Sequence, residues 1–143
     1  MKGKIALITG ATAGIGYSTA VRFAQNGYNV IITGRRSNNL YSLQERLKEE
    51  YNVDVIALCF DVRDYKEMKQ QLEGLSEEWK NVDVLVNNAG LAIGLEPVSE
   101  GEVEDYDTMI DTNIKGLLYC TKIVSRWMIN NRSGHIINIG SIA

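Results

Sequence analysis

Three glycines after the first apolar run of the chain have the spacing of a phosphate-binding turn. Gly10 and Gly14 lie between the apolar residues 5–8 and a segment with helical spacing at 15–26, and Gly16 lies at the start of that segment. The first glycine permits a tight turn, the second lets the backbone approach a phosphate, and the third lets the helix pack closely on a sheet. The helix N-terminus then offers unpaired N–H groups to a pyrophosphate. The predicted site comprises Gly10, Ala11, Thr12, Ala13, Gly14, Ile15 and Gly16.

A glycine-rich turn without a ligand is the alternative interpretation of these residues. Their position directly between a strand and a helix favours a dinucleotide site. No Gly-Lys-Ser/Thr sequence ends the turn, which argues against a P-loop nucleotide triphosphatase.

The residues that end the second apolar run indicate which dinucleotide is bound. An acidic side chain about twenty residues beyond the glycines would accept hydrogen bonds from a free ribose 2′-OH and favour NAD. This chain has Arg35 and Arg36 there instead. Guanidinium groups can hold a phosphate through paired hydrogen bonds and stack on adenine. The pair therefore predicts NADP(H), and a solvated arginine pair in a loop is the alternative.

Composition limits the classes of protein to which the chain can belong. Its 143 residues are 45% hydrophobic and 23% charged, with a net charge of −3. We expect one dinucleotide-binding domain over residues 1–143, with no nucleic-acid partner and no membrane span or membrane-surface site. Cys59 and Cys120 are isolated, and His135 is the only histidine. We therefore expect no metal site, no Ser-His-Asp triad and a cytoplasmic location.

Short runs rich in β-forming residues alternate with longer segments of helical spacing. Near-continuous apolar strands between helices are typical of a parallel sheet covered on both faces. We predict an α/β fold: a Rossmann-type doubly wound parallel sheet with five strands in the order 3-2-1-4-5 and right-handed crossovers. The predicted strands are 5–8, 30–33, 53–60, 82–86 and 135–139, and the helices are 15–26, 37–51, 65–79 and 103–130. The last three helices place on one face Leu40, Leu43 and Leu47; Met68, Leu72, Leu75 and Trp79; and Ile110, Ile114, Leu117, Leu118, Thr121, Val124 and Met128.

Four further motifs follow the glycine turn in order along the chain. They are Asp61-Val62 after the third strand, Asn87-Asn88-Ala89-Gly90 after the fourth, Asn113 in the long helix and Ser141 after the fifth strand. Together with residues 9–16, which match a TGxxxGxG loop, they resemble the short-chain dehydrogenase/reductase family over the whole chain. Residues 90–97 and 109–113 resemble its NADP-dependent 3-hydroxy acid dehydrogenase branch, which oxidises serine, allo-threonine and related acids.

Five residues match family positions that contact the cofactor. The resemblance implies that Asp61 and Val62 contact the adenine of NADP, and that Asn88, Ala89 and Gly90 line its ribose and nicotinamide. The structural alternatives are that Asp61 caps the helix starting near residue 64, and that Asn88 is an ordinary turn residue.

Two residues match catalytic positions. The resemblance implies that Ser141 hydrogen-bonds the substrate oxygen, and that Asn113 holds a water linking the active-site lysine to solvent. Asn113 could instead bond to the backbone of the fourth strand, a role compatible with the first. Ser141 could be a loop serine.

The family's general base is a tyrosine followed four residues later by a lysine, beyond the serine. The chain's one Tyr-x-x-x-Lys is Tyr65 with Lys69, which opens the helix after the third strand. That helix lies at the adenine end of the cofactor, so we interpret the pair as ordinary helix spacing. We expect an incomplete chain of a longer dehydrogenase, which would be a homo-oligomer, rather than a natural half-domain.

The resemblance implies an NADP-dependent oxidoreductase acting on a small-molecule substrate, namely a 3-hydroxy acid or a related alcohol or carbonyl compound. A 3-oxoacyl or other carbonyl reductase of the same family fits the same motifs. The alternative from another class is a noncatalytic NADP(H)-binding module, which the missing Tyr/Lys pair favours. A methyltransferase is less consistent, because it has no evident use for Arg35 and Arg36.

Overall fold

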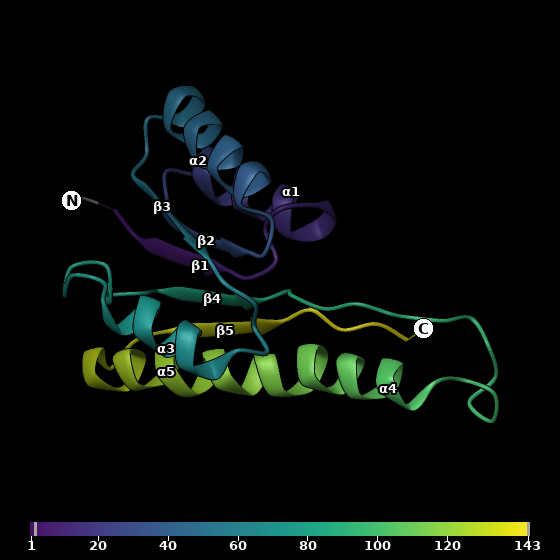
Figure 1. Ribbon diagram of the computed structural model, residues 1–143. Helices are drawn as coiled ribbons and strands as arrows, with labels where there is room; N and C mark the ends of the chain where they lie inside the picture. Colours follow the sequence, from purple (N-terminus) through teal and green to yellow (C-terminus); the bar gives the residue numbers. More distant parts are fainter. Residues whose placement is uncertain (2, 143) are drawn as a thin grey trace.

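A five-stranded sheet forms the centre of the computed structural model, which describes residues 1 and 3–142 (Figure 1). The strands are β1 (Ile5–Ile8), β2 (Asn29–Gly34), β3 (Val55–Cys59), β4 (Val84–Asn87) and β5 (His135–Asn138). They pair in the order β3-β2-β1-β4-β5, and each of these pairs is parallel. The predicted doubly wound sheet in the order 3-2-1-4-5 is confirmed.

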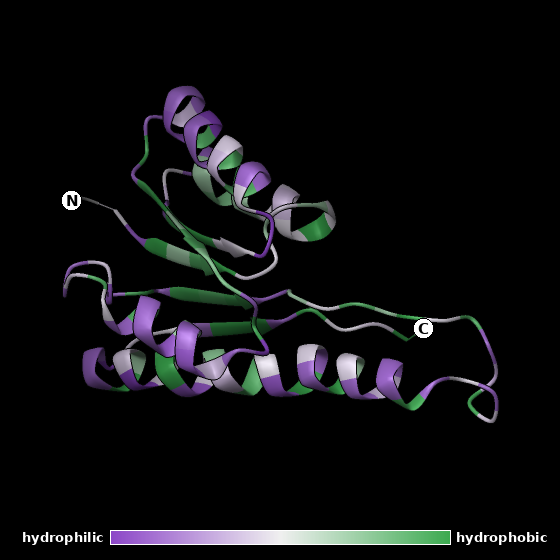
Figure 2. Ribbon diagram, viewed as in Figure 1, coloured by the Kyte–Doolittle hydropathy of each residue, from purple (hydrophilic) through white to green (hydrophobic). Residues whose placement is uncertain are grey.

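Helices cover both faces of this sheet. Figure 1 shows α1 (Gly14–Gln25) and α2 (Ser37–Tyr51) on one face, and α3 (Tyr65–Glu73) and α5 (Gly116–Asn131) on the other. Helix α4 (Val103–Ile110) and a π-helical turn, η1 (Asp111–Lys115), lead into α5 without a break. Figure 2 shows the strands as hydrophobic bands between helices whose outward sides are hydrophilic.

Two apolar layers hold the helices to the sheet, because successive strand residues point to opposite faces. Leu7 and Leu85 pack with the layer under α3 and α5. Ile8 and Ile32 pack with the layer under α1 and α2. All four side chains have no solvent exposure. Burying one such side chain contributes about 1.5–3 kcal/mol, so these layers fix the strand ends that carry the glycine turn and its neighbours.

Helix α2 has the predicted bounds, residues 37–51. Its three leucines, Leu40, Leu43 and Leu47, are all buried, as their common face predicts. The helix ends at Asn52, which adopts a left-handed conformation with φ 53°. Asparagine is one of the few residues besides glycine that tolerate this conformation, so the local sequence accounts for the end of the helix.

Helix α3 is shorter than predicted. It ends at Glu73, and residues 74–80 form turns instead of the expected continuation to residue 79. Leu75 and Trp79 nevertheless pack against the core, half-buried, from those turns. Their apolar spacing therefore arises from contact with the core, although these two residues do not lie in a helix.

The predicted apolar face of the long helix is wrong for three of its residues. Ile110, Ile114 and Leu118 are 46%, 54% and 57% exposed. Cys120 and Val124, by contrast, are fully buried. A π-helical turn holds more residues per turn than an α-helix, so η1 shifts the buried face relative to a continuous α-helical pattern.

Residues 88–102, between β4 and α4, contain no helix or strand. Within the described part of the chain, no helix is long and apolar enough to cross a membrane.

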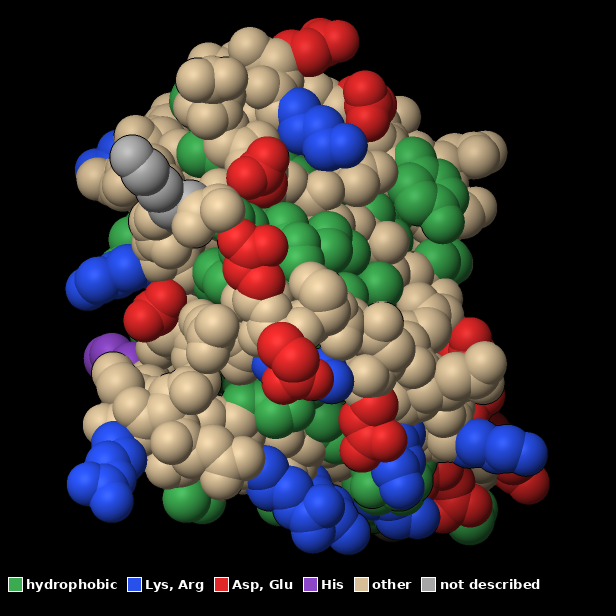
Figure 3. Space-filling model, turned by 90° about the vertical axis from the view of Figure 1, so that its left-hand side faces the viewer, with side chains coloured by type: hydrophobic (Ala, Val, Ile, Leu, Met, Phe, Trp, Pro, Cys, Tyr) green, Lys and Arg blue, Asp and Glu red, His purple; other side chains and the backbone are tan. Residues whose placement is uncertain are grey.

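Figure 3 shows the face at the left of Figure 1, where acidic and basic side chains surround a central apolar area. Positive and negative side chains are therefore mixed on that face, and neither sign of charge dominates its electrostatic potential.

Candidate functional site

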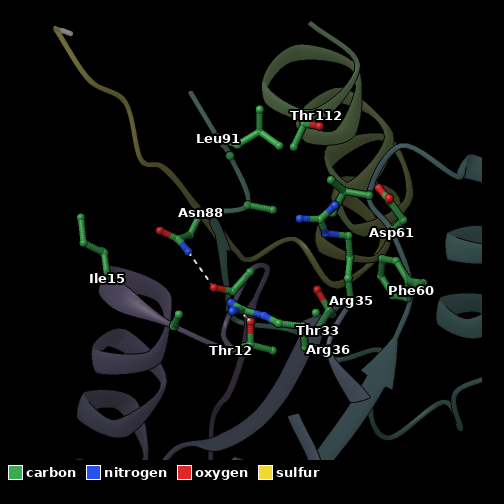
Figure 4. Close-up of a pocket in the computed structure, with 16 residues that line it drawn as sticks. Thr12, Ile15, Thr33, Arg35, Arg36, Phe60, Asp61, Asn88, Leu91 and Thr112 are labelled. Carbon is green, nitrogen blue, oxygen red and sulfur yellow. Dashed lines mark hydrogen bonds between the residues drawn. The ribbon is translucent and has the colours of Figure 1, made fainter. Parts of the chain in front are cut away.

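A cleft of about 310 Å³ opens at the carboxyl ends of β1, β2 and β4 (Figure 4). In a doubly wound sheet, ligands bind at this edge, where the strand order reverses direction. The lining residues are Gly10, Thr12, Ala13, Ile15, Thr33, Gly34, Arg35, Arg36, Phe60, Asp61, Val62, Asn88, Ala89, Gly90, Leu91 and Thr112. Segments far apart in the sequence, including the glycine turn, the arginine pair and the residues after β3 and β4, therefore line the same cleft.

The glycine turn is shaped by steric requirements that larger residues would violate. Gly10 has φ 63°, and a Cβ atom there would lie 2.8 Å from the Cα of Ala89. A Cβ on Gly16 would collide with the carbonyl oxygen of Gly10. Gly14 has φ 58°, and a Cβ there would meet no atom within 4 Å, so open space lies against its backbone. These features fit a turn that a phosphate can approach closely.

The N-terminus of α1 fits an anionic ligand for a second reason. Its N-cap residue, Ala13, has no side chain that could accept a hydrogen bond from the first turn, and that turn contains no acidic residue. The first N–H groups of a helix have no partner within the helix, and the helix dipole places partial positive charge there. The start of α1 is thus available to a pyrophosphate.

Asn88 ties the residues after β4 to the glycine turn. Its Nδ2 donates to the carbonyl oxygens of Thr9, at 3.1 Å, and Gly10, at 3.0 Å. In the opposite direction, Thr9 Oγ1 accepts hydrogen bonds from the backbone N–H groups of Asn88 and Ala89, both at 3.0 Å. The structural role of Thr9 was missed in the sequence, where the residue only marks the start of the glycine motif.

The two arginines lie in the same wall but differ in their contacts. Arg36 Nη2 donates to Thr12 Oγ1 at 2.8 Å, which fastens the arginine to the glycine turn. In Figure 4 the Arg35 side chain extends into the cleft, and its guanidinium lies between Asn88 and Asp61. A Cβ on Gly34 would lie 2.5 Å from Thr12 Cγ2, so a glycine at the end of β2 is needed for this close packing.

Asp61 lies on the opposite wall, next to the buried Phe60 and Val62. Hydrogen bonds from the Arg63 side chain hold the pKa of Asp61 below its usual value, with smaller contributions from the Arg63 backbone N–H and the Arg35 charge. The alternative role of Asp61 as a helix cap is wrong. Asp64 is the N-cap of α3, and its Oδ1 accepts a hydrogen bond from the N–H of Glu67 at 3.1 Å.

The two predicted catalytic residues do not line the cleft. Asn113 lies in η1, and its side chain hydrogen-bonds the backbone of Leu91, which follows β4. The structural alternative was a bond to the backbone of the fourth strand itself, and the structure places the bond in the loop beyond the end of β4. Ser141 is exposed, on the extended segment after β5. Tyr65 also lies outside the cleft, on α3, where its ring contacts that of Tyr119 at a centroid distance of 5.1 Å.

Of the predicted glycine-turn residues, Ala11, Gly14 and Gly16 support the cleft without lining it. The wall also contains residues that the sequence did not indicate: Thr33, Gly34, Phe60, Leu91 and Thr112. Among the described residues, the hydroxyl oxygens of Thr33 and Thr112 are buried without a hydrogen-bond partner.

A family model described as short chain dehydrogenase matches residues 4–143. The chain is 50% identical over 139 residues to NADP-dependent 3-hydroxy acid dehydrogenase YdfG of Salmonella typhi, covering 97% of this chain and 54% of that protein. It is 44% identical over 140 residues to sulfoacetaldehyde reductase 2 of Chromohalobacter salexigens, covering 97% of this chain and 55% of the relative. The chain thus spans about half the length of the curated relatives it matches.

Solved structures show the same relationship. The chain is similar to serine dehydrogenase from Escherichia coli, with TM-score 0.86 and 49% identity over 96% of this chain and 62% of the other. It is also similar to a closed form of serine dehydrogenase complexed with NADP⁺, with TM-score 0.88 and 48% identity, covering 96% and 54% of the two chains.

Proposed function

The chain belongs to the short chain dehydrogenase family, and on that premise we propose that it takes part in hydride transfer between NADP(H) and a small 3-hydroxy acid or related compound. The observation that carries this proposal is the cleft itself, where the glycine turn faces two arginines at the position that would hold an acid in an NAD-specific site. The similarity to relatives named NADP-dependent 3-hydroxy acid dehydrogenases supports both the cofactor and the substrate class.

The residues of the cleft divide into groups by the part of NADP(H) that they would bind. The glycine turn and the start of α1 bind the pyrophosphate. Arg35 and Arg36 bind the 2′-phosphate, because a guanidinium forms strong, directed hydrogen bonds with phosphate oxygens. Asp61 and Val62 contact the adenine. The remaining proposed contacts, with the ribose and nicotinamide side, come from Asn88, Ala89 and Gly90.

Bound NADP(H) supplies the hydride acceptor or donor. We propose that the Ser141 hydroxyl donates a hydrogen bond to the substrate oxygen and stabilises the charge that develops there. Asn113 fixes the loop after β4, beside the cofactor site. None of the seven tyrosines, all in the described part of the chain, lines the cleft. The general-base step is therefore not attributed to any of them.

Cofactor preference tests the central claim. We expect the intact protein to bind NADPH more tightly than NADH in calorimetric titrations. Replacement of both Arg35 and Arg36 by Ala should weaken NADPH binding about 100-fold, since charge-assisted hydrogen bonds to a phosphate are lost, and leave NADH binding nearly unchanged. Arg22→Ala, which removes an exposed arginine of α1 outside the cleft, is the control. An equal loss for both cofactors would contradict the proposed 2′-phosphate contact.

A carbonyl reductase is the second candidate, favoured by the similarity to sulfoacetaldehyde reductase 2. The two candidates differ in their best substrate. We expect kcat/KM to be higher for NADP⁺-linked oxidation of serine or allo-threonine than for NADPH-linked reduction of sulfoacetaldehyde or a 3-oxoacyl thioester. The opposite order would favour the reductase. Tight NADPH binding without turnover of any of these compounds would favour a noncatalytic NADP(H)-binding module.

We also propose that the protein forms a homo-oligomer. Ile110, Ile114 and Leu118 form an exposed apolar stripe along α4, η1 and α5. Large exposed apolar patches commonly mark protein contacts. A cytoplasmic location is proposed from the two cysteines, Cys59 and Cys120, which are both free thiols as expected in a reducing compartment. Sedimentation equilibrium of the intact protein tests the first proposal, and cell fractionation tests the second.

A further inference from the structure

The side chain of Thr12, in the glycine turn, contacts two residues at the end of β2. Its Oγ1 accepts a hydrogen bond from Arg36 Nη2 at 2.8 Å, and Figure 4 shows the two side chains next to one another. Its methyl carbon, Cγ2, lies against Gly34, so that a Cβ atom added to Gly34 would be only 2.5 Å from it. Because both groups of a threonine are attached to the same Cβ, one χ1 angle places them together. One orientation of Thr12 therefore makes both contacts.

The backbone on both sides of this contact is held by hydrogen bonds. The N–H of Ala11 donates to the carbonyl oxygen of Thr33 at 2.9 Å, which ties the glycine turn to β2. The N–H of Phe60 donates to the carbonyl oxygen of Gly34 at 3.1 Å, which ties the end of β2 to the end of β3. A side chain at position 34 could not be accommodated by moving either segment without weakening one of these bonds. The Thr12 side chain would have to turn instead, and it would then lose its bond to Arg36.

Gly34 occupies the place at which an acidic residue would act on the ribose. It is the last residue of β2, it lines the cleft, and it lies about twenty residues beyond Gly14. An acidic side chain there accepts hydrogen bonds from a free 2′-OH and repels a 2′-phosphate. The Thr12 methyl group occupies the space that such a side chain needs. A Cβ on Gly34 would lie 3.6 Å from the Cβ of Thr12, an ordinary contact, so on the Thr12 side chain only the methyl group closes this position.

We propose that Thr12 is a specificity-determining residue of the dinucleotide site. Its hydroxyl holds Arg36 in the orientation that binds a 2′-phosphate. Its methyl group requires glycine at position 34, which excludes the acidic side chain that would select a free 2′-OH. This inference rests on the proposed binding of NADP(H). The preference between the two cofactors thus depends on a small uncharged residue of the glycine turn in addition to the two arginines.

Two substitutions separate the two roles of Thr12. Thr12→Ser keeps the hydroxyl and removes the methyl group, whereas Thr12→Val keeps a branched side chain and removes the hydroxyl. The dissociation constants of NADPH and NADH are measured by calorimetry on the intact parent protein and on both variants, alone and combined with Gly34→Asp. Thr108 supplies the matched control, because it is also half-buried and its hydroxyl donates to the Glu104 carbonyl oxygen at 2.9 Å, but outside the cleft.

The first comparison tests the hydroxyl. We expect Thr12→Val to weaken NADPH binding about threefold to tenfold, because an Arg36 side chain that is not held in advance must be ordered on binding. NADH binding should stay unchanged, since NADH has no 2′-phosphate. Thr12→Ser should keep the NADPH affinity within about twofold of the parent, because its hydroxyl still accepts from Arg36. Thr108→Val and Thr108→Ser should change neither constant.

The second comparison tests the methyl group. Gly34→Asp alone should weaken NADPH binding without strengthening NADH binding, because the new side chain and the Thr12 methyl group compete for one space. Combined with Thr12→Ser it should bind NADH at least about tenfold more tightly than alone, the range for a hydrogen bond to a charged group. Combined with Thr12→Val it should not. Should Gly34→Asp fail to fold, Gly34→Ala tests the same contact through stability: it should lower the midpoint of urea denaturation less in Thr12→Ser than in the parent.

Two results would overturn the inference while leaving the proposed function intact. One is an NADPH affinity of Thr12→Val equal to that of the parent, which would show that Arg36 needs no fastening. The other is NADH binding by Gly34→Asp alone as tight as in combination with Thr12→Ser or, where Gly34→Asp does not fold, an equal loss of stability from Gly34→Ala in both backgrounds. Failure of the parent to bind NADPH at all would instead contradict the proposed function.

Discussion

The side chain of Asn113 pairs with the backbone of Leu91 in both directions. Its Oδ1 accepts from the Leu91 N–H at 2.8 Å, and its Nδ2 donates to the Leu91 carbonyl oxygen at 2.7 Å. Gly90, the preceding residue, could not carry a side chain without close contact, since a Cβ there would lie 3.1 Å from Asn113 Oδ1. The π-helical turn and the end of the cleft wall after β4 are therefore joined by one amide group.

Asn113→Ala removes both hydrogen bonds to Leu91. We expect a loss of about 1 kcal/mol in the free energy of unfolding, because the pair is exposed and water can replace part of each bond. Urea denaturation checks this expectation. Asn130→Ala, an exposed position on α5, is the control and should change stability by no more than about 0.5 kcal/mol. Equal stability of Asn113→Ala and the parent would show that the pairing does not hold the loop.

Thr9 offers a sharper comparison, because a second buried threonine has no partner. Thr9 Oγ1 accepts two backbone N–H groups, those of Asn88 and Ala89. The hydroxyl of Thr33 has no hydrogen-bond partner among the described residues. The two side chains are 2% and 0% exposed, so the same substitution can be made at two equally buried sites.

We expect Thr9→Val to lower the free energy of unfolding by about 1–3 kcal/mol, since valine keeps the volume but leaves two buried donors without an acceptor. Thr33→Val removes a hydroxyl that makes no bond and should leave stability unchanged or raise it. Urea denaturation of both variants measures the difference. Equal losses at the two sites would mean that the Thr9 hydrogen bonds contribute no net stability.

Gly14 and Gly27 form a second matched pair. Both have positive φ, 58° and 82°, and a Cβ at either position would meet no atom within 4 Å. Valine at either site should cost about 1–2 kcal/mol of stability through backbone strain. We expect only Gly14→Val to abolish binding of both NADPH and NADH, because its side chain fills the space that a phosphate needs. Calorimetric titration measures this, and retained binding in Gly14→Val would remove the turn from the proposed site.

The alternation of strands and helices could be predicted from the sequence because burial imposes an apolar pattern on every element. The strand order followed from the doubly wound fold that this alternation indicates. Helix α2 is an example of the apolar pattern. Its apolar spacing predicted both its bounds and the burial of Leu40, Leu43 and Leu47. Apolar spacing gave wrong predictions where a buried residue lies outside a helix, or where a helical residue is exposed. Trp79 reaches the core from a turn, and Ile114 lies on the exposed side of a helix whose register η1 has shifted.

The composition of the cleft was predicted more completely than its hydrogen bonds. Gly10 and the two arginines were indicated by their residue types at strand ends, and Asp61 was indicated by the resemblance to the family. The hydrogen-bond partner of each polar group could not be predicted, because it depends on which loops come together in the folded chain. The bond of Arg36 to Thr12 and the bonds of Asn88 to the glycine turn join segments 24 and 78 or 79 residues apart.

The ion pair of Asp61 with Arg63 should also be visible in the pH dependence of stability. Hydrogen bonds from Arg63 are the main reason that the pKa of Asp61 is lower in the folded protein than its usual value. A carboxyl group with a lowered pKa adds stability above its unfolded-state pKa, and this contribution is lost as the pH falls through the folded-state pKa.

Arg63→Gln should therefore lose stability relative to the parent at neutral pH, and the difference should shrink as the pH falls through that acidic range, because a protonated Asp61 gains little from Arg63. The effect should be modest, since the pair is partly exposed and water screens it. Urea denaturation of both proteins over a series of pH values measures the difference. A difference that stays constant into the acidic range would mean that Arg63 stabilises the fold by packing and not through its bond to an ionised Asp61.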